Sequence, residues 1–270
     1  MVRSGIITLT TDFGLADDYA GVLHGVIWGI NPQARIVDLT HGVQPQNILQ
    51  GAFLLASAWR YFPPGTVHLA VVDPGVGTAR PAVAMETAQA FFVAPDNGLL
   101  GEVWEGLSEA ERAAARIVEL TEPRYWLPQV SPTFHARDIF APVAAHLAAR
   151  LPLQRLGRPR QGIVLLEGRR AAFQEGGTLL GRIVHVDRFG NCISNVVEGQ
   201  LVALSREGGL VVDVAGHLLE GLARTYADAG PGQAQALVGS TGRLEIAVRD
   251  GNAAAQLGIS IGDPVRVSRA

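Results

Sequence analysis

The sequence predicts a two-domain protein, in which an α/β domain with a largely parallel sheet precedes a smaller antiparallel β-domain. Strand patterns alternate with helical patterns up to about residue 150, which is typical of a parallel sheet. From residue 176 onward, short strands and many glycines replace the helical patterns. This change favours an antiparallel sheet, either open or closed into a barrel. We place the boundary near residue 170, which gives domains 1–170 and 171–270.

The elements of the first domain follow from apolar spacing. Runs of apolar and β-branched residues predict strands, and apolar residues at every third or fourth position predict helices. The expected strands are 5–12, 34–40, 66–73, 82–86 and 90–95. The expected helices are one that starts after Asp17 or Asp18, a second at 45–60 and a third at about 137–149. Pro63-Pro64-Gly65 and Pro95-Asp96-Asn97-Gly98 end or turn the chain between them. In the second domain, strands are expected within 178–187, 209–217, 242–250 and 263–268.

Composition excludes several classes of protein. Hydrophobic residues make up 48% of the 270 residues and charged residues 17%, so the chain is globular rather than disordered. A net charge of -3 without a basic run argues against a nucleic acid or an anionic membrane as partner. The single cysteine, Cys192, excludes an internal disulfide and a CxxC metal site. With no signal-peptide pattern and no apolar run long enough to span a bilayer, we expect a cytoplasmic protein.

Two aspartates stand directly after predicted strands. Asp12 follows the first strand and Asp73 ends the third. Ligands of open parallel sheets bind beyond the carboxyl ends of the strands, so these acids suggest a polar ligand with hydroxyl groups. The alternative for Asp12 is an ordinary turn or cap residue.

The segment from Asp73 to Arg80 reads DPGVGTAR. It matches a dinucleotide-binding GxGxxG motif poorly, because Arg80 stands where the third glycine belongs. Asp73 and Arg80 could equally form an ion pair that only closes a loop. Asp12, Asp17 and Asp18 match no Mg²⁺ or Ca²⁺ loop, so we expect no metal.

Among the seven histidines, His135 stands at the start of a predicted helix. A helix N-terminus disfavours imidazolium and keeps the ring neutral, so that it can accept a proton. The alternative is a capping or core histidine. The remaining histidines have no comparable setting, and we expect His24, His41, His68 and His185 to be structural.

The densest polar segment of the second domain is HVDRFGNCISN, from His185 to Asn195. Phe189 offers an aromatic face, and Asn191 offers a hydrogen-bond donor and acceptor that suit a flat heterocycle such as adenine. The pattern by itself favours a plain hairpin, with Gly190 and Asn191 in the turn and Phe189 in the core.

Seven segments together resemble one family. They are TLTTDFGLADDY, DLTHGVQP, YFPPGTVHLAVVDPGVGTAR, PDNGLL, TFHARDIFAP, VDRFGN and GSTGRLEIA. Their order is similar to that in the S-adenosylmethionine (SAM) hydroxide adenosyltransferases, which are SAM hydrolases related to the SAM-dependent fluorinase and chlorinase. The resemblance implies a Rossmann-like N-terminal domain and a C-terminal β-barrel. It also implies a homotrimer, with each active site between the N-terminal domain of one subunit and the C-terminal domain of its neighbour.

The resemblance further implies a reaction and a set of site residues. SAM is the substrate, no cofactor is needed, and water attacks the ribose C5′ to release adenosine and L-methionine. The catalytic residues implied are Asp73, Arg80 and His135. The substrate-binding residues implied are Asp12 for the ribose diol, Asp17 and Asp187 near the methionine ammonium, Ser240 at the methionine carboxylate, and Phe189 and Asn191 around adenine.

One departure from the family pattern bears on the reaction. The related hydrolases have glycine in FHGRDIF, where this chain has Ala136. The fluorinase has a serine at this position that contacts halide, and alanine cannot donate that hydrogen bond. The halogenases also have tyrosine in place of Asp73. Hydrolysis is therefore favoured over the two alternatives, a SAM-dependent halogenase and a non-catalytic protein that binds SAM or adenosine.

Overall fold

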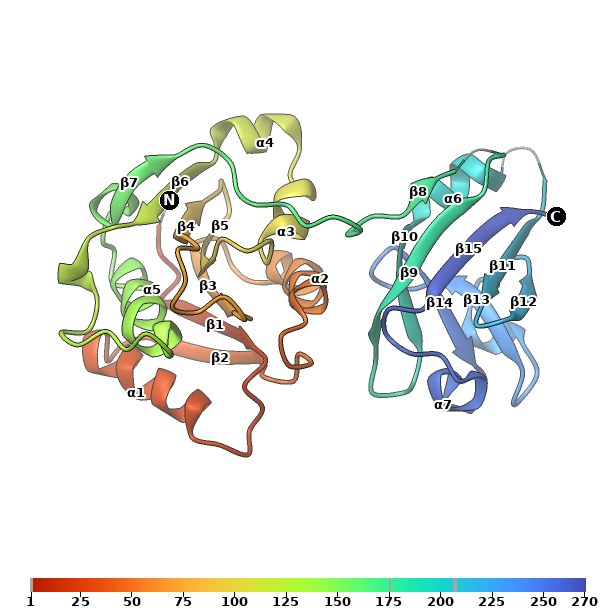
Figure 1. Cartoon of the computed structure of the whole chain (residues 1–270), viewed down its shortest axis with the longest axis horizontal. Helices are drawn as coiled ribbons and strands as arrows, with labels where there is room; N and C mark the ends of the chain where they lie inside the picture. Colours follow the sequence, from red (N-terminus) through yellow and green to blue (C-terminus); the bar gives the residue numbers. More distant parts are fainter. Residues whose placement is uncertain (1, 175, 206–207) are drawn as a thin grey trace. The chain divides into compact units, whose positions relative to one another are not determined.

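The computed structural model describes residues 2–174, 176–205 and 208–270. The chain divides into two compact units, Met1–Leu166 and Glu167–Ala270, which we call unit 1 and unit 2 (Figure 1). Within the described ranges, no helix has both the length and the apolar character needed to cross a membrane.

Unit 1 is built on a seven-stranded sheet with the order β2-β1-β3-β5-β4-β6-β7. Strands β2, β1, β3 and β5 are parallel, and β4, β6 and β7 join them antiparallel. The expected parallel core is thus confirmed. The strands are β1 (Ile6–Thr11), β2 (Arg35–Thr40), β3 (Thr66–Val71), β4 (Ala82–Glu86), β5 (Ala90–Pro95), β6 (Arg116–Leu120) and β7 (Gly157–Arg160). Strands β6 and β7 were not predicted from the sequence; β7 has the sequence GRPR, which carries no apolar pattern.

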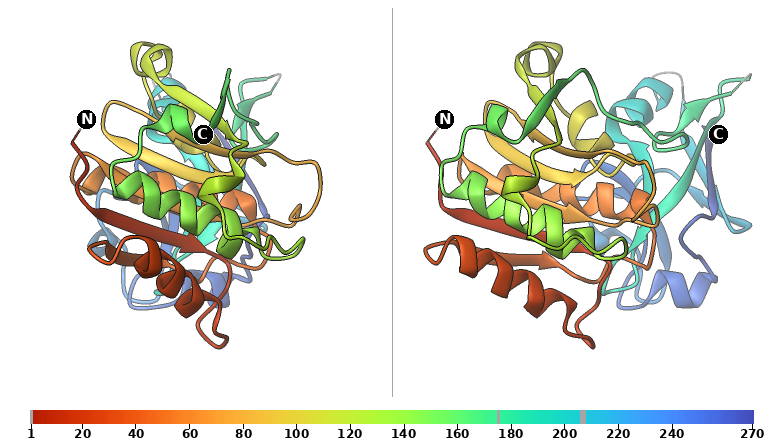
Figure 2. Two further views of the ribbon diagram at one scale, coloured as in Figure 1. Left: turned by 90° about the vertical axis from the view of Figure 1, so that its left-hand side faces the viewer. Right: turned by 60° about the vertical axis from the view of Figure 1, so that its left-hand side comes forward.

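Helices cover both faces of this sheet (Figure 2). Helices α1 (Tyr19–Ile30) and α5 (Ala141–Ala148) pack on one face, and α2 (Ile48–Ala58) and α3 (Gly101–Glu105) on the other. All six residues of β3 are buried, because alternate side chains enter the two cores. Leu69 and Val71 pack in the core with α1 and α5, whereas Ala70 packs in the core with α2. Helix α4 (Glu109–Ala114) begins at a Ser108–Glu111 capping box.

Two predicted helices differ from the observed ones at an end. A 3₁₀ turn, Trp59–Tyr61, completes the helix expected at 45–60. The helix expected at 137–149 begins with a π-helical turn, Ala136–Phe140, and continues as α5. Because π turns are often found at functional sites, the position of His135 directly before this one is notable.

Unit 2 is an antiparallel sheet with the order β12-β11-β15-β9-β10-β14-β13, and β8 pairs with β9. The end strands β12 and β13 contact each other, so the sheet forms a nearly closed barrel, as expected. Its core holds alternate residues of the strands, such as Ile183, Ile246 and Val265. The strands are β8 (Ala172–Phe173), β9 (Leu179–Val186), β10 (Cys192–Val197), β11 (Leu210–Val214), β12 (His217–Glu220), β13 (Ala234–Val238), β14 (Arg243–Val248) and β15 (Pro264–Arg269). The short helices are α6 (Glu198–Ser205) and α7 (Ala253–Leu257).

Candidate active site

Asp12 and Asp73 lie at the same edge of the unit 1 sheet. They follow β1 and β3, which are parallel neighbours in which Thr11 pairs with Val71. Together with His135 they line a cavity of about 400 Å³. The cavity therefore stands where ligands of parallel sheets bind, beyond the carboxyl ends of the strands.

The loop after β3 returns Arg80 to Asp73. Val76 N–H donates to the Asp73 carbonyl (3.2 Å), and the Thr78 hydroxyl donates to the Gly75 carbonyl (2.7 Å). Gly77 has a φ of +78°, and a Cβ built on it would lie 2.4 Å from the carbonyl oxygen of Pro132. A side chain at this position would therefore be strained and would also clash. The glycines of DPGVGTAR serve this turn rather than a phosphate-binding loop.

Asp73, Arg80 and His135 form a connected group. Arg80 Nε donates to both carboxylate oxygens of Asp73, at 2.9 Å and 3.0 Å, and Nη2 donates to Oδ2 at 2.5 Å. The Asp73 and Arg80 side chains are only 5% and 10% exposed. The same Nη2 lies 3.0 Å from His135 Nδ1. The structure thus brings together all three residues of the predicted catalytic set.

The contact with Arg80 fixes the protonation state of His135. A guanidinium has no acceptor, so Nδ1 must accept this hydrogen bond and the ring proton of neutral His135 lies on Nε2. Burial and the positive charge of Arg80 both lower the pKa of His135, against a smaller opposing effect of Asp73. His135 is therefore held as a neutral imidazole that can donate from Nε2.

Two further side chains, one half-buried and one fully buried, support this group. Asn97, in the PDNG turn, donates from Nδ2 to the Val72 carbonyl (2.8 Å) and so fixes the backbone just before Asp73. Asp138 is fully buried, pairs with Arg137 (2.6 Å) and accepts from Ser131 N–H (2.8 Å). It ties the segment before His135 to the π-helical turn that follows.

An aromatic wall in the same cavity was missed by the sequence analysis. Phe13, Tyr19 and Phe134 meet with ring centroids 5.2–6.0 Å apart and all line the cavity. Phe13 and Phe134 stand next to Asp12 and His135 in the sequence. That adjacency of aromatic and polar residues is the signal that could have identified them.

Asp12 and Asp17, in the loop after β1, differ in their position relative to the cavity. Asp12 Oδ2 accepts from Gln46 N–H at 2.8 Å, which fixes its carboxylate at the cavity. Gln46 adopts a left-handed backbone with a φ of +64° to do so. Asp17 is exposed and, in the structure as described, does not line this cavity. Unit 1 therefore brings Asp12, but not Asp17, to the cavity that Asp73 and His135 line.

Unit 2 has a broad cavity of about 990 Å³ that is lined by Asp187, Phe189, Asn191 and Ser240. Asp187 organises the turn that carries Phe189 and Asn191. It accepts from the backbone N–H groups of Phe189 and Asn191, both at 2.9 Å, and from Asn191 Nδ2 at 3.0 Å. The Phe189 ring is 75% exposed. The prediction of a hairpin core position for Phe189 is therefore wrong, because the turn directs the ring outward.

Further residues line the unit 2 cavity, among them Tyr226, Arg249 and Asn252. The sequence offered no motif for them. Asn252 caps α7 by accepting from Ala255 N–H at 2.8 Å. A Cβ on Gly190 would lie 2.1 Å from Asn252 Cγ, so this glycine allows the 187–191 turn to approach the start of α7.

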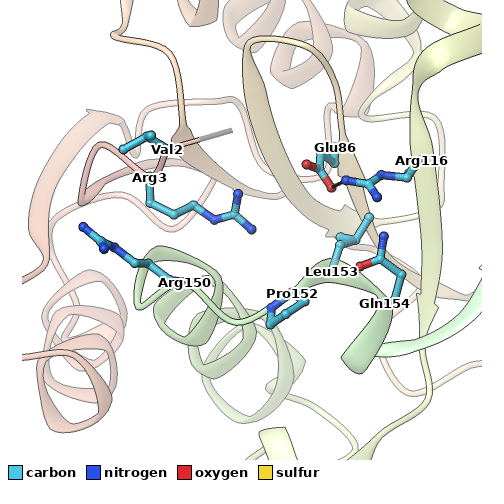
Figure 3. Close-up of a pocket in the computed structure, with 8 residues that line it drawn as sticks. All are labelled: Val2, Arg3, Glu86, Arg116, Arg150, Pro152, Leu153 and Gln154. Atoms are coloured by element: carbon cyan, nitrogen blue, oxygen red, sulfur yellow. Dashed lines mark hydrogen bonds and ion pairs between the residues drawn. The ribbon is translucent and has the colours of Figure 1, made fainter.

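Another cavity of about 400 Å³ in unit 1 lies among arginines (Figure 3). Arg3 donates to the carbonyls of Leu147 and Leu151 and stacks on Phe91, and Arg116 pairs with Glu86 at 2.7 Å. Arg3, Arg116 and Glu86 are thus engaged with protein partners. Among the described lining residues, none belongs to the predicted site.

Comparisons with known proteins identify the family to which the two units correspond. Residues 7–157 match the SAM hydroxide adenosyltransferase N-terminal domain, and residues 181–266 match its C-terminal domain. The chain is 40% identical to an (R)-S-adenosyl-L-methionine hydrolase of Salinispora arenicola, over 99% of both chains. It is 29% identical to a fluorinase of Nocardia brasiliensis, over 98% of this chain and 97% of that one.

Among solved structures, an uncharacterized conserved protein from Thermotoga maritima is similar, with a TM-score of 0.86 and 38% identity. The match covers 98% of this chain and 100% of that one. The two family domains together span most of the sequence and fall on the two structural units. The chain belongs to the SAM hydroxide adenosyltransferase family.

Proposed function

We propose that the protein hydrolyses SAM to adenosine and L-methionine, and that the (R) epimer at sulfur is its substrate. The observation that carries the proposal is the contact of Asp73, Arg80 and His135 at a cavity on the carboxyl edge of the sheet. The named activity of the Salinispora relative supports the choice of reaction and epimer.

The chemistry of the substrate explains why these residue types suffice. Water oxygen forms a bond to C5′ while the C5′–S bond breaks, and the bonding electron pair stays on sulfur. Methionine leaves as a neutral thioether, so its departure needs no general acid. Neutral water is a poor nucleophile, so the site must place it in line with the C5′–S bond and accept a proton from it.

The geometry favours Asp73 as the proton acceptor. Asp73 Oδ1 accepts only one bond from Arg80, so it keeps a lone pair that can take the proton of the water. The acceptor lone pair of the His135 ring is already directed at Arg80. His135 is therefore suited to hold the water by donating from Nε2. Arg80 cannot act as a base, and it anchors both partners and stabilises developing hydroxide.

The remaining residues of the unit 1 cavity suit the nucleoside and the sulfonium. Asp12 is a carboxylate acceptor for the two ribose hydroxyls. The wall of Phe13, Tyr19 and Phe134 offers aromatic faces to a cation, an attraction of roughly 0.5–2 kcal/mol. Ala136 is buried beside His135 and presents a methyl group, which cannot donate a hydrogen bond to a halide.

The unit 2 cavity suits the adenine and methionine ends. Phe189 presents an exposed ring for stacking, and the Asn191 carboxamide can bond the adenine edge. Ser240 can donate to the methionine carboxylate, and the charges of Asp187 and Asp17 favour its ammonium. We propose that the protein is a homotrimer and that a neighbouring subunit supplies the groups of unit 2, whereas Asp17 comes from unit 1. Analytical ultracentrifugation tests this part, and a monomer with full activity contradicts it.

The experiment that tests the reaction is incubation of purified protein with each SAM epimer in H₂¹⁸O, with and without halide. We expect adenosine that carries ¹⁸O at its 5′ hydroxyl, formed faster from the (R) epimer. A 5′-halo-5′-deoxyadenosine product would identify a halogenase. Unchanged SAM together with measurable binding would identify a binding protein.

A further inference from the structure

Unit 1 contains a second polar cluster, formed by two histidines and an aspartate. His24 projects from α1, Asp38 lies in β2, and His41 follows β2. His24 Nε2 and His41 Nε2 lie 2.8 Å and 3.0 Å from the same oxygen, Asp38 Oδ1. The three donor atoms lie within 4.8 Å of one another. Among the described residues that line the catalytic cavity, none belongs to this cluster.

We propose that His24, Asp38 and His41 form a binding site for a divalent transition metal of the Zn²⁺ class. Two imidazoles and one carboxylate are a common ligand set for such ions, with water in the remaining position. Metal–ligand bonds of about 2.0–2.1 Å place tetrahedral ligands about 3.3 Å apart. The observed spacings of 2.8 Å and 3.0 Å to Asp38 Oδ1, with the two histidine nitrogens no more than 4.8 Å apart, bracket this value, so side-chain shifts alone can admit an ion.

The surroundings of His41 support the proposal. Its other ring nitrogen, Nδ1, lies 2.7 Å from Thr11 Oγ1, and both residues are buried. With a metal on Nε2, Nδ1–H donates to this hydroxyl, which is the outer contact that metal-binding histidines usually make. The Thr11 contact thus fixes the ring so that Nε2 faces Asp38.

The other two ligands leave access for the ion. The Asp38 side chain is 41% exposed and that of His24 is 22% exposed. The His24 ring packs edge-on against Trp28, with centroids 5.5 Å apart. An ion can therefore reach the cluster from solvent, and water can complete its coordination.

The cluster also has a simpler explanation, in which both rings donate Nε2–H to Asp38 and no ion binds. The two cases differ in consequence. A bound metal ion would replace the Nε2 protons of His24 and His41. Metal binding is therefore measurable as an affinity for the ion and as a change in the NMR signals of these two ring nitrogens. The sequence analysis expected no metal and a structural role for His24 and His41, so the proposal departs from that expectation.

Metal binding here would stabilise the segment that carries Asp12. The His41 carbonyl accepts from Gly14 N–H at 2.8 Å, and Thr11 Oγ1 accepts from Phe13 N–H at 3.2 Å. A metal that holds His41 therefore holds both ends of residues 11–14. A ligand that binds only the folded state also raises the unfolding midpoint.

The test is calorimetric titration of tag-free, chelator-treated protein with ZnCl₂. We expect one strong site per chain. Asp38→Asn and His24→Gln should each weaken binding by more than the roughly 10–100-fold expected for the outer-contact variant Thr11→Val. The matched control His217→Gln changes a histidine of unit 2 and should leave the affinity unchanged. Far-UV circular dichroism checks that each variant is folded.

A second measurement uses only the wild-type chain. ZnCl₂ should shift the imidazole ¹⁵N resonances of His24 and His41 and leave that of His217 in place. The proposal is overturned if zinc does not bind or moves neither resonance. It is also overturned if binding is unchanged in Asp38→Asn and His24→Gln, which would make the ion adventitious.

Discussion

Replacing Asp73 with asparagine separates the proposed chemistry from simple loop closure. The carboxylate accepts three N–H bonds from Arg80, and both side chains are nearly buried. An asparagine side chain keeps one oxygen acceptor but turns an NH₂ donor toward the guanidinium. Losing the charge of one partner in such a pair costs up to about 3–5 kcal/mol. Because one acceptor remains, we expect unit 1 to lose about 2–4 kcal/mol of unfolding free energy.

The effect on catalysis should be selective. A positioned base contributes about 10²–10⁴-fold in rate, so kcat for Asp73→Asn should fall by that factor while KM changes little. Adenosine release is followed by chromatography. Stability is followed by tryptophan fluorescence in denaturant, which reports on unit 1 because all four tryptophans lie there.

The matched control is Glu86→Gln. Glu86 pairs with Arg116 at 2.7 Å and its side chain is 11% exposed, but it lies in the other cavity (Figure 3). We expect this variant to lose stability and keep its kcat per folded molecule. If Asp73→Asn behaves in the same way, with kcat within a few-fold of wild type, Asp73 only closes a loop and the proposed mechanism is wrong.

Three further predictions concern stability. Burial lowers the pKa of His68 to about 3. As the pH falls, His68 therefore takes up a proton in the unfolded chain before it does so in the folded protein. The contribution of neutral His68 to the free energy of unfolding is complete above about pH 6.5 and is lost toward pH 3, at about 1.4 kcal/mol per pH unit. His68→Gln should flatten this slope in denaturant titrations, and an unchanged slope would contradict the assignment. Gly77→Ala should cost clearly more than Gly14→Ala, because both glycines have positive φ but only Gly77 faces Pro132; thermal unfolding should reveal this difference, and equal shifts would rule out the clash. Asp138→Asn should lower the unfolding midpoint and adenosine formation together, since the buried carboxylate holds the segment before His135; a loss of activity with unchanged stability would argue against a supporting role.

Much of the fold follows from local pattern. Buried strands such as β3 have continuous apolar sequences, and α1 follows from apolar spacing, so both were predictable. The edge strand β7 was not, because its sequence GRPR carries no apolar pattern. The aromatic wall was also missed, since Phe13 and Phe134 are 121 positions apart and meet only through packing.

The candidate site likewise has features that were predictable from sequence and features that were not. Sequence alone determined that an acid follows each of two strands, that a glycine turn precedes Arg80, and that the family motifs occur in order. Only the tertiary structure decided that Arg80 bonds Asp73 and His135 at once, which fixes the proton of His135 on Nε2. The physical reason is that side-chain chemistry is local to a residue, whereas hydrogen-bond partners and burial depend on which distant segments the fold brings together.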